Sequence, residues 1–237
     1  WPPTLISVAE VQAAVTVAAP AMSSIKIVGK NKIIFSWKQV KGTAGYRVYR
    51  KSGNSGWKVV KTITGSKNVT FTDTKVSTGA RYTYTVKAYR KSGKNIIWSS
   101  YNKKGLTAIA GLNSLTLNKT SLTLTPKKTY TLKINGTSLK PSWKSSNTKV
   151  VSVTSAGKVT AVKTGTANIT AILGGRKFTC KVTVKNPASA NAKLTQNYAK
   201  LKKYISQKGR YIEDGSQFIN VKVNEESTLM IGYLKKE

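Results

Sequence analysis

The amino-acid sequence predicts a mainly β protein, with two tandem β-sandwiches followed by a small C-terminal α+β segment. Between Ile25 and Val184, apolar residues recur with a period of two in short runs rich in Val, Ile, Thr and Tyr. Turn residues interrupt these runs roughly every 8 to 12 residues, a spacing typical of sandwiches. With 39% hydrophobic residues in 237, the chain has enough apolar side chains for a core in each sandwich.

The first group of expected strands has one apolar face on each strand. Ile33, Phe35 and Trp37 share a face, and Tyr82, Tyr84, Val86 and Ala88 share another, as the two-residue repeat of a strand requires. We also expect Val15 to Val17 to start a first strand. The other expected strands are Lys32 to Trp37, Tyr46 to Lys51, Trp57 to Ile63, Val69 to Thr72, Tyr82 to Tyr89 and Ile96 to Ser100.

This first group resembles a fibronectin type III domain over roughly residues 21–108. Trp37, at the end of Ile-Ile-Phe-Ser-Trp, matches the core tryptophan of that family's second strand, and the run from Gly45 to Arg50 matches the third. The resemblance implies a tyrosine corner at Tyr82. Thr78 stands where the family usually has proline, and no Arg-Gly-Asp tripeptide is present, so integrin recognition is not implied.

The second group extends from about Leu112 to Lys185. Its expected strands lie near 114–117, 121–125, 129–134, 142–145, 150–153, 158–162, 167–172 and 178–184. The group resembles the bacterial immunoglobulin-like group 2 family in Trp143-Lys-Ser-Ser-Asn, Val150-Val-Ser-Val, Gly157-Lys-Val-Thr-Ala and Gly165-Thr-Ala-Asn-Ile-Thr-Ala. That family is typical of bacterial and phage surface proteins, where it serves as a stalk, spacer or adhesive module. Trp143 is an expected core plug, and Gly157 and Gly165 occupy positions where turns need backbone freedom.

The sequence divides into four expected parts. Residues 1–20 form an N-terminal segment or linker, 21–110 the fibronectin type III-like sandwich, and 111–186 the bacterial Ig-like sandwich, with a short connection near Ala108 to Leu112. Residues 187–237 are expected to hold a linker, a helix and a β-hairpin, which form either a truncated α+β domain or a piece that docks on the second sandwich. The helix is predicted from the stripe Leu194, Tyr198, Leu201 and Ile205, and the hairpin from the runs 217–223 and 228–234.

The charge of the chain is strongly positive. Lys and Arg number 41 and Asp and Glu only seven, which gives a formal net charge of +34. Asp73 is the only acidic residue between Ser23 and Pro187, so the positive charge belongs to the sandwiches and we expect polyanions as partners. No run of about 18 uncharged apolar residues occurs, so no transmembrane segment is predicted.

The residue content excludes most catalytic chemistry. The chain has no histidine, which removes Ser-His-Asp and Cys-His triads and histidine-ligated zinc. The single cysteine, Cys180, excludes an intramolecular disulfide, and strand alternation places its thiol inside. Asp73 is interpreted as the cap of a turn. We therefore expect no enzyme activity, no cofactor and no metal site.

One sheet face is the candidate binding site. By strand parity, Arg47, Tyr49 and Lys51 lie on the outward face beside Lys87, Tyr89 and Lys91. Tyrosine rings can stack on sugars or bases while the cations hold carboxylates or phosphates. The alternative interpretation is a solvated sheet face covered by long amphipathic side chains.

These features predict a non-catalytic array of structural or adhesive modules in an extracellular protein, either secreted or on the bacterial cell surface. The expected partner is an anionic polysaccharide or teichoic acid of a Gram-positive type envelope, or a host glycopolymer, and other surface proteins are a further expected class. A second hypothesis makes the chain the accessory region of a larger secreted enzyme that acts on carbohydrate or peptidoglycan. Nucleic-acid binding is disfavoured, because charge alone suggests it and no nucleic-acid-binding motif is present.

Overall fold

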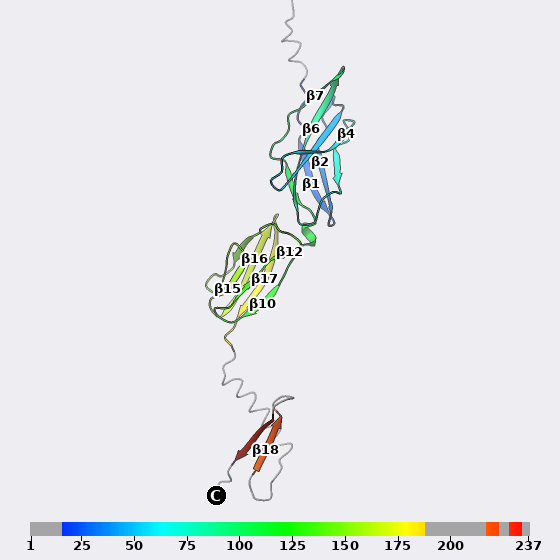
Figure 1. Cartoon of the computed structure of the whole chain (residues 1–237). Helices are drawn as coiled ribbons and strands as arrows, with labels where there is room; N and C mark the ends of the chain where they lie inside the picture. Colours follow the sequence, from blue (N-terminus) through cyan, green and yellow to red (C-terminus); the bar gives the residue numbers. More distant parts are fainter. Residues whose placement is uncertain (1–15, 188–216, 223–227, 234–237) are drawn as a thin grey trace, which may run out of the picture. The chain divides into compact units, whose positions relative to one another are not determined.

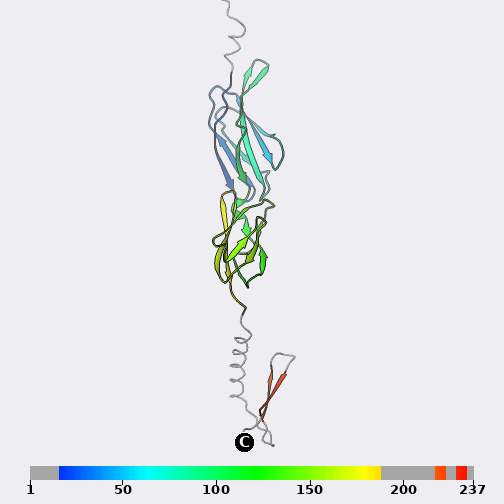
Figure 2. The ribbon, with the colours of Figure 1, turned by 90° about the vertical axis from the view of Figure 1, so that its left-hand side faces the viewer.

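The computed structural model describes residues 16–187, 217–222 and 228–233. The chain divides into two compact units, Trp1–Val184 and Lys185–Glu237, and the first unit holds both sandwiches. Figure 1 and Figure 2 show the strands of these sandwiches from two directions at right angles. The predicted mainly β fold class is confirmed.

The first sandwich has one sheet in the order β1-β2-β5 and a second in the order β4-β3-β6-β7, with β8 pairing the first half of β6. All of these pairings are antiparallel. The strands are β1 (Met22–Val28), β2 (Lys32–Trp37), β3 (Gly45–Ser52), β4 (Lys58–Thr64), β5 (Thr70–Asp73), β6 (Arg81–Ser92), β7 (Asn95–Trp98) and β8 (Leu106–Ile109).

The two ends of this sandwich differ from the sequence prediction. The expected strand start at Val15 to Val17 is wrong where the structure describes it, because residues 16 and 17 are not in a strand and β1 begins at Met22. Pro20 lies between Val17 and Met22, and it has no amide hydrogen to donate to a neighbouring strand. The strand β8 was not predicted, and the short connection expected near residues 108–112 is buried.

Aromatic side chains fill the first core, as their parity predicts. Phe35, Trp37, Tyr46 and Tyr84 are almost fully buried, and the ring centroids of Trp37 and Tyr46 lie 5.3 Å apart. The hydroxyl of Tyr82 accepts a hydrogen bond from the backbone N–H of Ser77 at 3.0 Å. This bond is the tyrosine corner that the resemblance implied, and it fixes the approach to β6.

The second sandwich contains a mixed sheet, a small antiparallel sheet and a two-stranded ladder. Their orders are β10-β17-β16-β13, β11-β15-β14 and β12-β9, and only β10 and β17 pair in parallel. The elements are η1 (Leu112–Ser114), β9 (Thr116–Leu117), β10 (Ser121–Leu124), β11 (Thr129–Thr131), β12 (Ile134–Asn135), β13 (Ser142–Ser145), β14 (Val151–Val153), β15 (Lys158–Ala161), β16 (Gly165–Leu173) and β17 (Arg176–Val184). The single strand expected at 129–134 is divided, because β11 pairs with β15 whereas β12 pairs with β9.

Two predictions about this second core, on Gly157 and Cys180, are confirmed. Trp143, the expected core plug, is half-buried and packs against the buried residues, and Gly157 adopts a φ of +80° beside it. A Cβ at Gly157 would lie 2.4 Å from the carbonyl oxygen of Leu132 and 2.8 Å from the Trp143 ring, so glycine is required there. Cys180 is buried on the inward face of β17, as the alternation of that strand predicts.

The thiol of Cys180 is expected to be unreactive in the folded chain. Burial raises the pKa of this thiol, which keeps it in the protonated form, and the thiolate is the reactive species. We expect a thiol-specific reagent such as iodoacetamide to label the chain slowly in buffer and rapidly in denaturant. Fast labelling of the native protein, followed by mass spectrometry, would contradict the buried position.

A third hydrophobic cluster joins the two sandwiches. It brings Ile109 of β8 and Leu112 of η1 together with Leu173 and Phe178 of the second sandwich. The guanidinium of Arg176 lies 4.4 Å from the Phe178 ring and donates hydrogen bonds to the carbonyl oxygens of Leu112 and Leu115. The segment that connects the two sandwiches therefore packs against apolar side chains of the second sandwich and is also hydrogen-bonded to Arg176.

The second unit contains a hairpin of β18 (Gln217–Lys222) and β19 (Thr228–Tyr233), paired antiparallel with Ile219 opposite Ile231. This pairing confirms the two predicted strands over residues 217–222 and 228–233, and the last predicted residue of each, 223 and 234, lies outside the described residues. The helix predicted over 194–205 lies outside the described residues.

Candidate functional site

Five of the six predicted site residues belong to the outer face of the sheet β4-β3-β6-β7, and four of them lie together there with half-buried side chains. In the antiparallel pair β3 and β6, Arg47 is opposite Lys87 and Tyr49 is opposite Thr85. The intervening residues Tyr46 and Val48 point into the core. Arg47, Tyr49, Lys51 and Lys87 are all half-buried, so their side chains lie along the sheet instead of extending freely into solvent.

Each cation of this face lies over an aromatic ring. The guanidinium carbon of Arg47 is 4.3 Å from the centroid of the Trp98 ring, and the Nζ of Lys51 is 4.8 Å from that of Trp57. The Nζ of Lys87 lies 4.9 Å from the ring of Tyr101 and 5.8 Å from that of Tyr49. We call these residues the cation-aromatic face: Arg47, Tyr49, Lys51, Trp57, Lys87, Trp98 and Tyr101.

The rings also contact one another. Tyr49 and Tyr101 are stacked with centroids 6.5 Å apart, and Trp57 meets Tyr101 edge-on at 6.4 Å. Such ring pairs restrict the side chains before any ligand arrives. The cations above them are consequently held in place, which lowers the entropy lost on binding.

The other two predicted residues have different positions. Tyr89 belongs to the same face, but only 6% of its surface is exposed, because its ring packs 5.2 Å from that of Trp98. Tyr89 lies opposite Gly45, and a side chain at position 45 would collide with the Tyr89 hydroxyl. Lys91 lies past the end of β3, opposite Ile96 in the β6-β7 hairpin, and is exposed.

Three residues of the face were missed by sequence reasoning. Trp98 pairs with Tyr89 across the hairpin, so the turn between Ser92 and Asn95 was the signal that could have placed it. Tyr101 and Trp57 gave no such signal, because Tyr101 comes from the loop 99–105 and Trp57 precedes β4.

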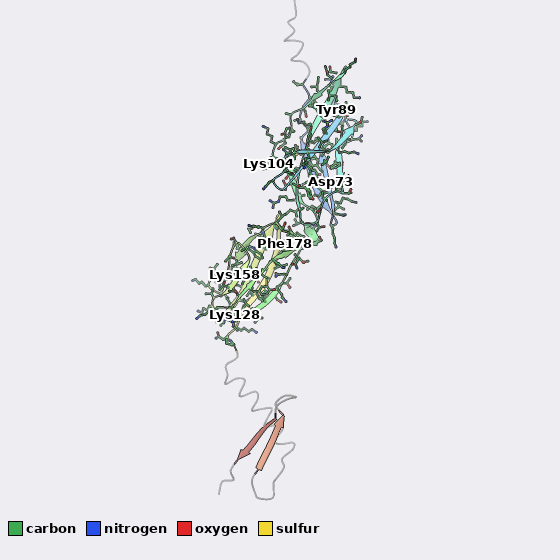
Figure 3. The ribbon with its side chains drawn as sticks, in the orientation of Figure 1. Asp73, Tyr89, Lys104, Lys128, Lys158 and Phe178 are labelled. Carbon is green, nitrogen blue, oxygen red and sulfur yellow. The ribbon has the colours of Figure 1, made fainter. Side chains whose placement is uncertain are left out.

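The loop 99–105 is fastened to the face by its own polar groups. Thr85 donates its hydroxyl hydrogen to the carbonyl oxygen of Asn102 at 2.8 Å. The side-chain oxygen of Asn102 accepts from the N–H groups of Lys104 and Gly105, which closes the loop. Figure 3 labels Lys104 in this loop, together with Tyr89 of β6. The loop thereby brings Tyr101 onto the sheet.

Among the described residues, no carboxylate lies on the face to balance its charge. Asp73 is the only acidic residue between residues 11 and 212 of the sequence, and it is 3% exposed in the core. Among the described residues its bond to Arg50, at 2.7 Å, is the one ion pair. Within those same residues, no group of three or more potential metal ligands occurs, and no helix is long and apolar enough to cross a membrane. Cations held over aromatic rings, as they are here, can attract and orient an anion.

The geometry defines a class of protein: tandem β-sandwich modules with a cationic, aromatic sheet face. Residues 111–184 match the family model of the bacterial Ig-like domain (group 2). An amylopullulanase of Thermoanaerobacterium saccharolyticum is 30% identical over 101 residues, which cover 33% of this chain and 8% of that protein. The chain thus spans a small part of that relative.

Two solved structures are among those that match this chain. A Fn3-like protein from Clostridium thermocellum is 27% identical, with a TM-score of 0.30, and the match covers 37% of this chain and 90% of that one. A C-terminal fragment of intimin, solved in complex with the intimin-binding domain of its translocated receptor, is 17% identical, with a TM-score of 0.35. That match covers 70% of this chain and 64% of the fragment.

Proposed function

We propose that this chain is a non-catalytic part of a bacterial extracellular protein, and that its first sandwich binds an anionic glycopolymer of the envelope or of a host. The cation-aromatic face carries this proposal. Three cations, Arg47, Lys51 and Lys87, lie over rings on one sheet face, and no carboxylate in the sandwiches competes with a ligand for them.

The chemistry of the face suits charged sugars. Aromatic rings stack on the apolar faces of sugar rings, while ammonium and guanidinium groups attract carboxylates or phosphates. Lysines predominate in the chain, and a lysine is a point charge without the fork geometry of arginine. Binding is expected to be broad in specificity and sensitive to salt.

The match to an amylopullulanase favours a second candidate, an accessory region of a larger secreted enzyme that acts on carbohydrate. In that case the same face would hold a polysaccharide near a catalytic domain elsewhere in the protein. The complete open reading frame distinguishes the two candidates, because only the second requires a catalytic domain. Both place the chain outside the cell, as a secreted or a surface protein, which agrees with the bacterial Ig-like match.

Retention on purified cell walls tests the proposal. The chain is applied to Gram-positive cell walls, to the same walls stripped of teichoic acid, and to DNA, at rising salt. We expect intact walls to retain it at about 0.15 M salt, where the Debye length is about 8 Å and diffuse attraction is largely screened. Equal loss from all three surfaces would leave only generic charge and would contradict the proposal.

A matched pair of variants separates the face from the total charge. Lys87→Gln removes a cation from the face, whereas Lys158→Gln removes an exposed cation from β15 of the second sandwich, labelled in Figure 3. Both lower the net charge by one. We expect Lys87→Gln to weaken wall binding roughly tenfold, as loss of a partly desolvated cation-aromatic contact would, and Lys158→Gln to have little effect. Equal effects of the two variants would exclude the face as the site.

A further inference from the structure

A cleft lies between the first and second sandwiches, next to the cation-aromatic face. Its volume is about 520 Å³, within the range of sites for small ligands. The first sandwich provides one wall, from Lys51 and the following turn to Arg81 at the start of β6. The second sandwich provides the other wall with Ser138 and Leu139. Both sandwiches are needed to form it.

The walls of the cleft are fixed by backbone contacts. The hydroxyl of Thr137 donates to the carbonyl oxygen of Gly79 at 2.7 Å and accepts from the N–H of Leu139 at 3.1 Å. Gly79 and Gly136 approach so closely that a Cβ on Gly79 would lie 1.9 Å from the Gly136 carbonyl oxygen. The segment that carries Ser138 and Leu139 is thereby tied to the start of β6.

The lining is cationic and rich in small polar groups. Of the described residues that line it, Lys51 and Arg81 are the charged ones and none is a carboxylate. Hydroxyl groups of Ser52 and Ser138 and the amide of Asn54 provide donors and acceptors for sugar hydroxyls, whereas the Thr83 hydroxyl is already bonded to that of Thr107 at 2.8 Å. This lining suits a single sugar unit that carries one negative charge.

Lys51 belongs both to the cleft and to the cation-aromatic face, where it lies over Trp57. Arg47, Tyr49 and Lys51 are alternate residues of β3. The Cα atoms of Arg47 and Lys51 are therefore roughly 13 Å apart along the strand. A polymer that follows β3 from Arg47 reaches Lys51 and then the cleft.

We propose that the cleft is the end subsite of the face, and that it takes one anionic sugar residue of the polymer, with Lys51 and Arg81 holding its charge. This inference rests on the proposed function. It adds that recognition requires the second sandwich, through Ser138, and that affinity depends on the length of the polymer.

Oligomers of galacturonic acid, from one to ten units, test this subsite by isothermal titration calorimetry. Maltooligosaccharides of the same lengths are the neutral control, and glucose-1-phosphate distinguishes a phosphate from a carboxylate as the preferred charge. Three variants are compared. Arg81→Gln removes a charge from the exposed rim of the cleft, and Ser138→Trp fills the cleft. Lys87→Gln removes a cation from the cation-aromatic face. Thermal unfolding of each variant verifies that it is folded.

The native chain is expected to bind a single galacturonate weakly, and to gain affinity with length until the face is covered. Arg81→Gln and Ser138→Trp should abolish binding of the monomer and weaken the decamer threefold to tenfold. Lys87→Gln should weaken the decamer and leave the monomer unchanged.

If both cleft variants bind every oligomer as the native chain does, the cleft is not a subsite of the polymer. A lower affinity of Lys87→Gln for the decamer would still support the cation-aromatic face. If Lys87→Gln has no effect on walls or decamer, the proposed function fails. If the native chain binds no anionic oligomer and no sugar phosphate, the subsite is wrong even where walls retain the chain.

Discussion

Replacement of Asp73 with alanine is expected to destabilise the first sandwich by about 3 kcal/mol. One carboxylate oxygen accepts hydrogen bonds from the Nη1 of Arg50 at 2.7 Å and from the Tyr84 hydroxyl at 2.8 Å. The other accepts the N–H of Lys75 at 2.9 Å. Alanine would leave the buried hydroxyl without an acceptor and the guanidinium without a counter-charge. The expected loss is at the low end for a broken buried pair, because 24% of Arg50 is exposed and can be hydrated.

The protonation of Tyr84 depends on this arrangement. Burial, together with the hydrogen bond to Asp73 and the charge of Asp73, raises the pKa of the Tyr84 hydroxyl. The hydroxyl therefore stays a donor to the carboxylate at any ordinary pH. A variant without the carboxylate has a donor in the core with nothing to receive its hydrogen, which adds to the cost.

The loss is measured by urea unfolding, followed by tryptophan fluorescence, because Trp37, Trp57 and Trp98 of the first sandwich are three of the five tryptophans of the chain. Asp73→Asn keeps an acceptor and the volume, and should cost about 1 to 2 kcal/mol, less than alanine. Thr74→Ala, at the exposed neighbouring position, is the control and should stay within about 0.5 kcal/mol of the native chain. A stability of Asp73→Ala within that same margin would show that the buried network contributes nothing.

Asp73 also shows how far the sequence can predict this structure. Its role as a turn cap was predicted and is confirmed by the bond to Lys75. Its bonds to Arg50 and Tyr84 were missed, because these residues lie on β3 and β6 and a single sequence does not give the pairing of distant strands. A signal existed, since Arg50 has the same parity as the core residues Tyr46 and Val48. A cation at an inward position requires an acid, and the sandwiches have only one.

The cation-aromatic face was likewise predicted only in part from the sequence. Alternation along β3 and β6 correctly predicted that Arg47, Tyr49, Lys51 and Lys87 share the outer side of the sheet. Alternation could not predict which of the outward side chains are covered by other segments of the chain. Thr83 and Thr85 have outward parity yet are buried, the latter bonded to the loop 99–105. The course of that loop depends on tertiary hydrogen bonds and not on a local repeat, so Tyr101 was missed.

Replacement of Gly79 with alanine is expected to disrupt the contact between the sandwiches and to cost more than a strained backbone alone. Gly79 has a φ of +79°, which costs an alanine about 1 kcal/mol. Its new Cβ would also lie 1.9 Å from the carbonyl oxygen of Gly136 and 2.9 Å from the Cα of Thr137. Because these are backbone atoms, the segment 136–137 must move away, and the hydrogen bond from Thr137 to the Gly79 carbonyl is lost with it.

Gly29→Ala is the matched control for this prediction. Its φ is +59°, and a Cβ there would meet nothing within 4 Å, so only the backbone cost remains. We expect Gly79→Ala to be less stable than Gly29→Ala by about 2 kcal/mol, the range of a forced overpacking. Hydrogen exchange should show faster exchange of the Leu139 amide in Gly79→Ala alone, because that amide donates to the Thr137 hydroxyl. Equal stability and equal exchange in the two variants would mean that the sandwiches do not depend on this contact, and the cleft beside it would then have only one fixed wall.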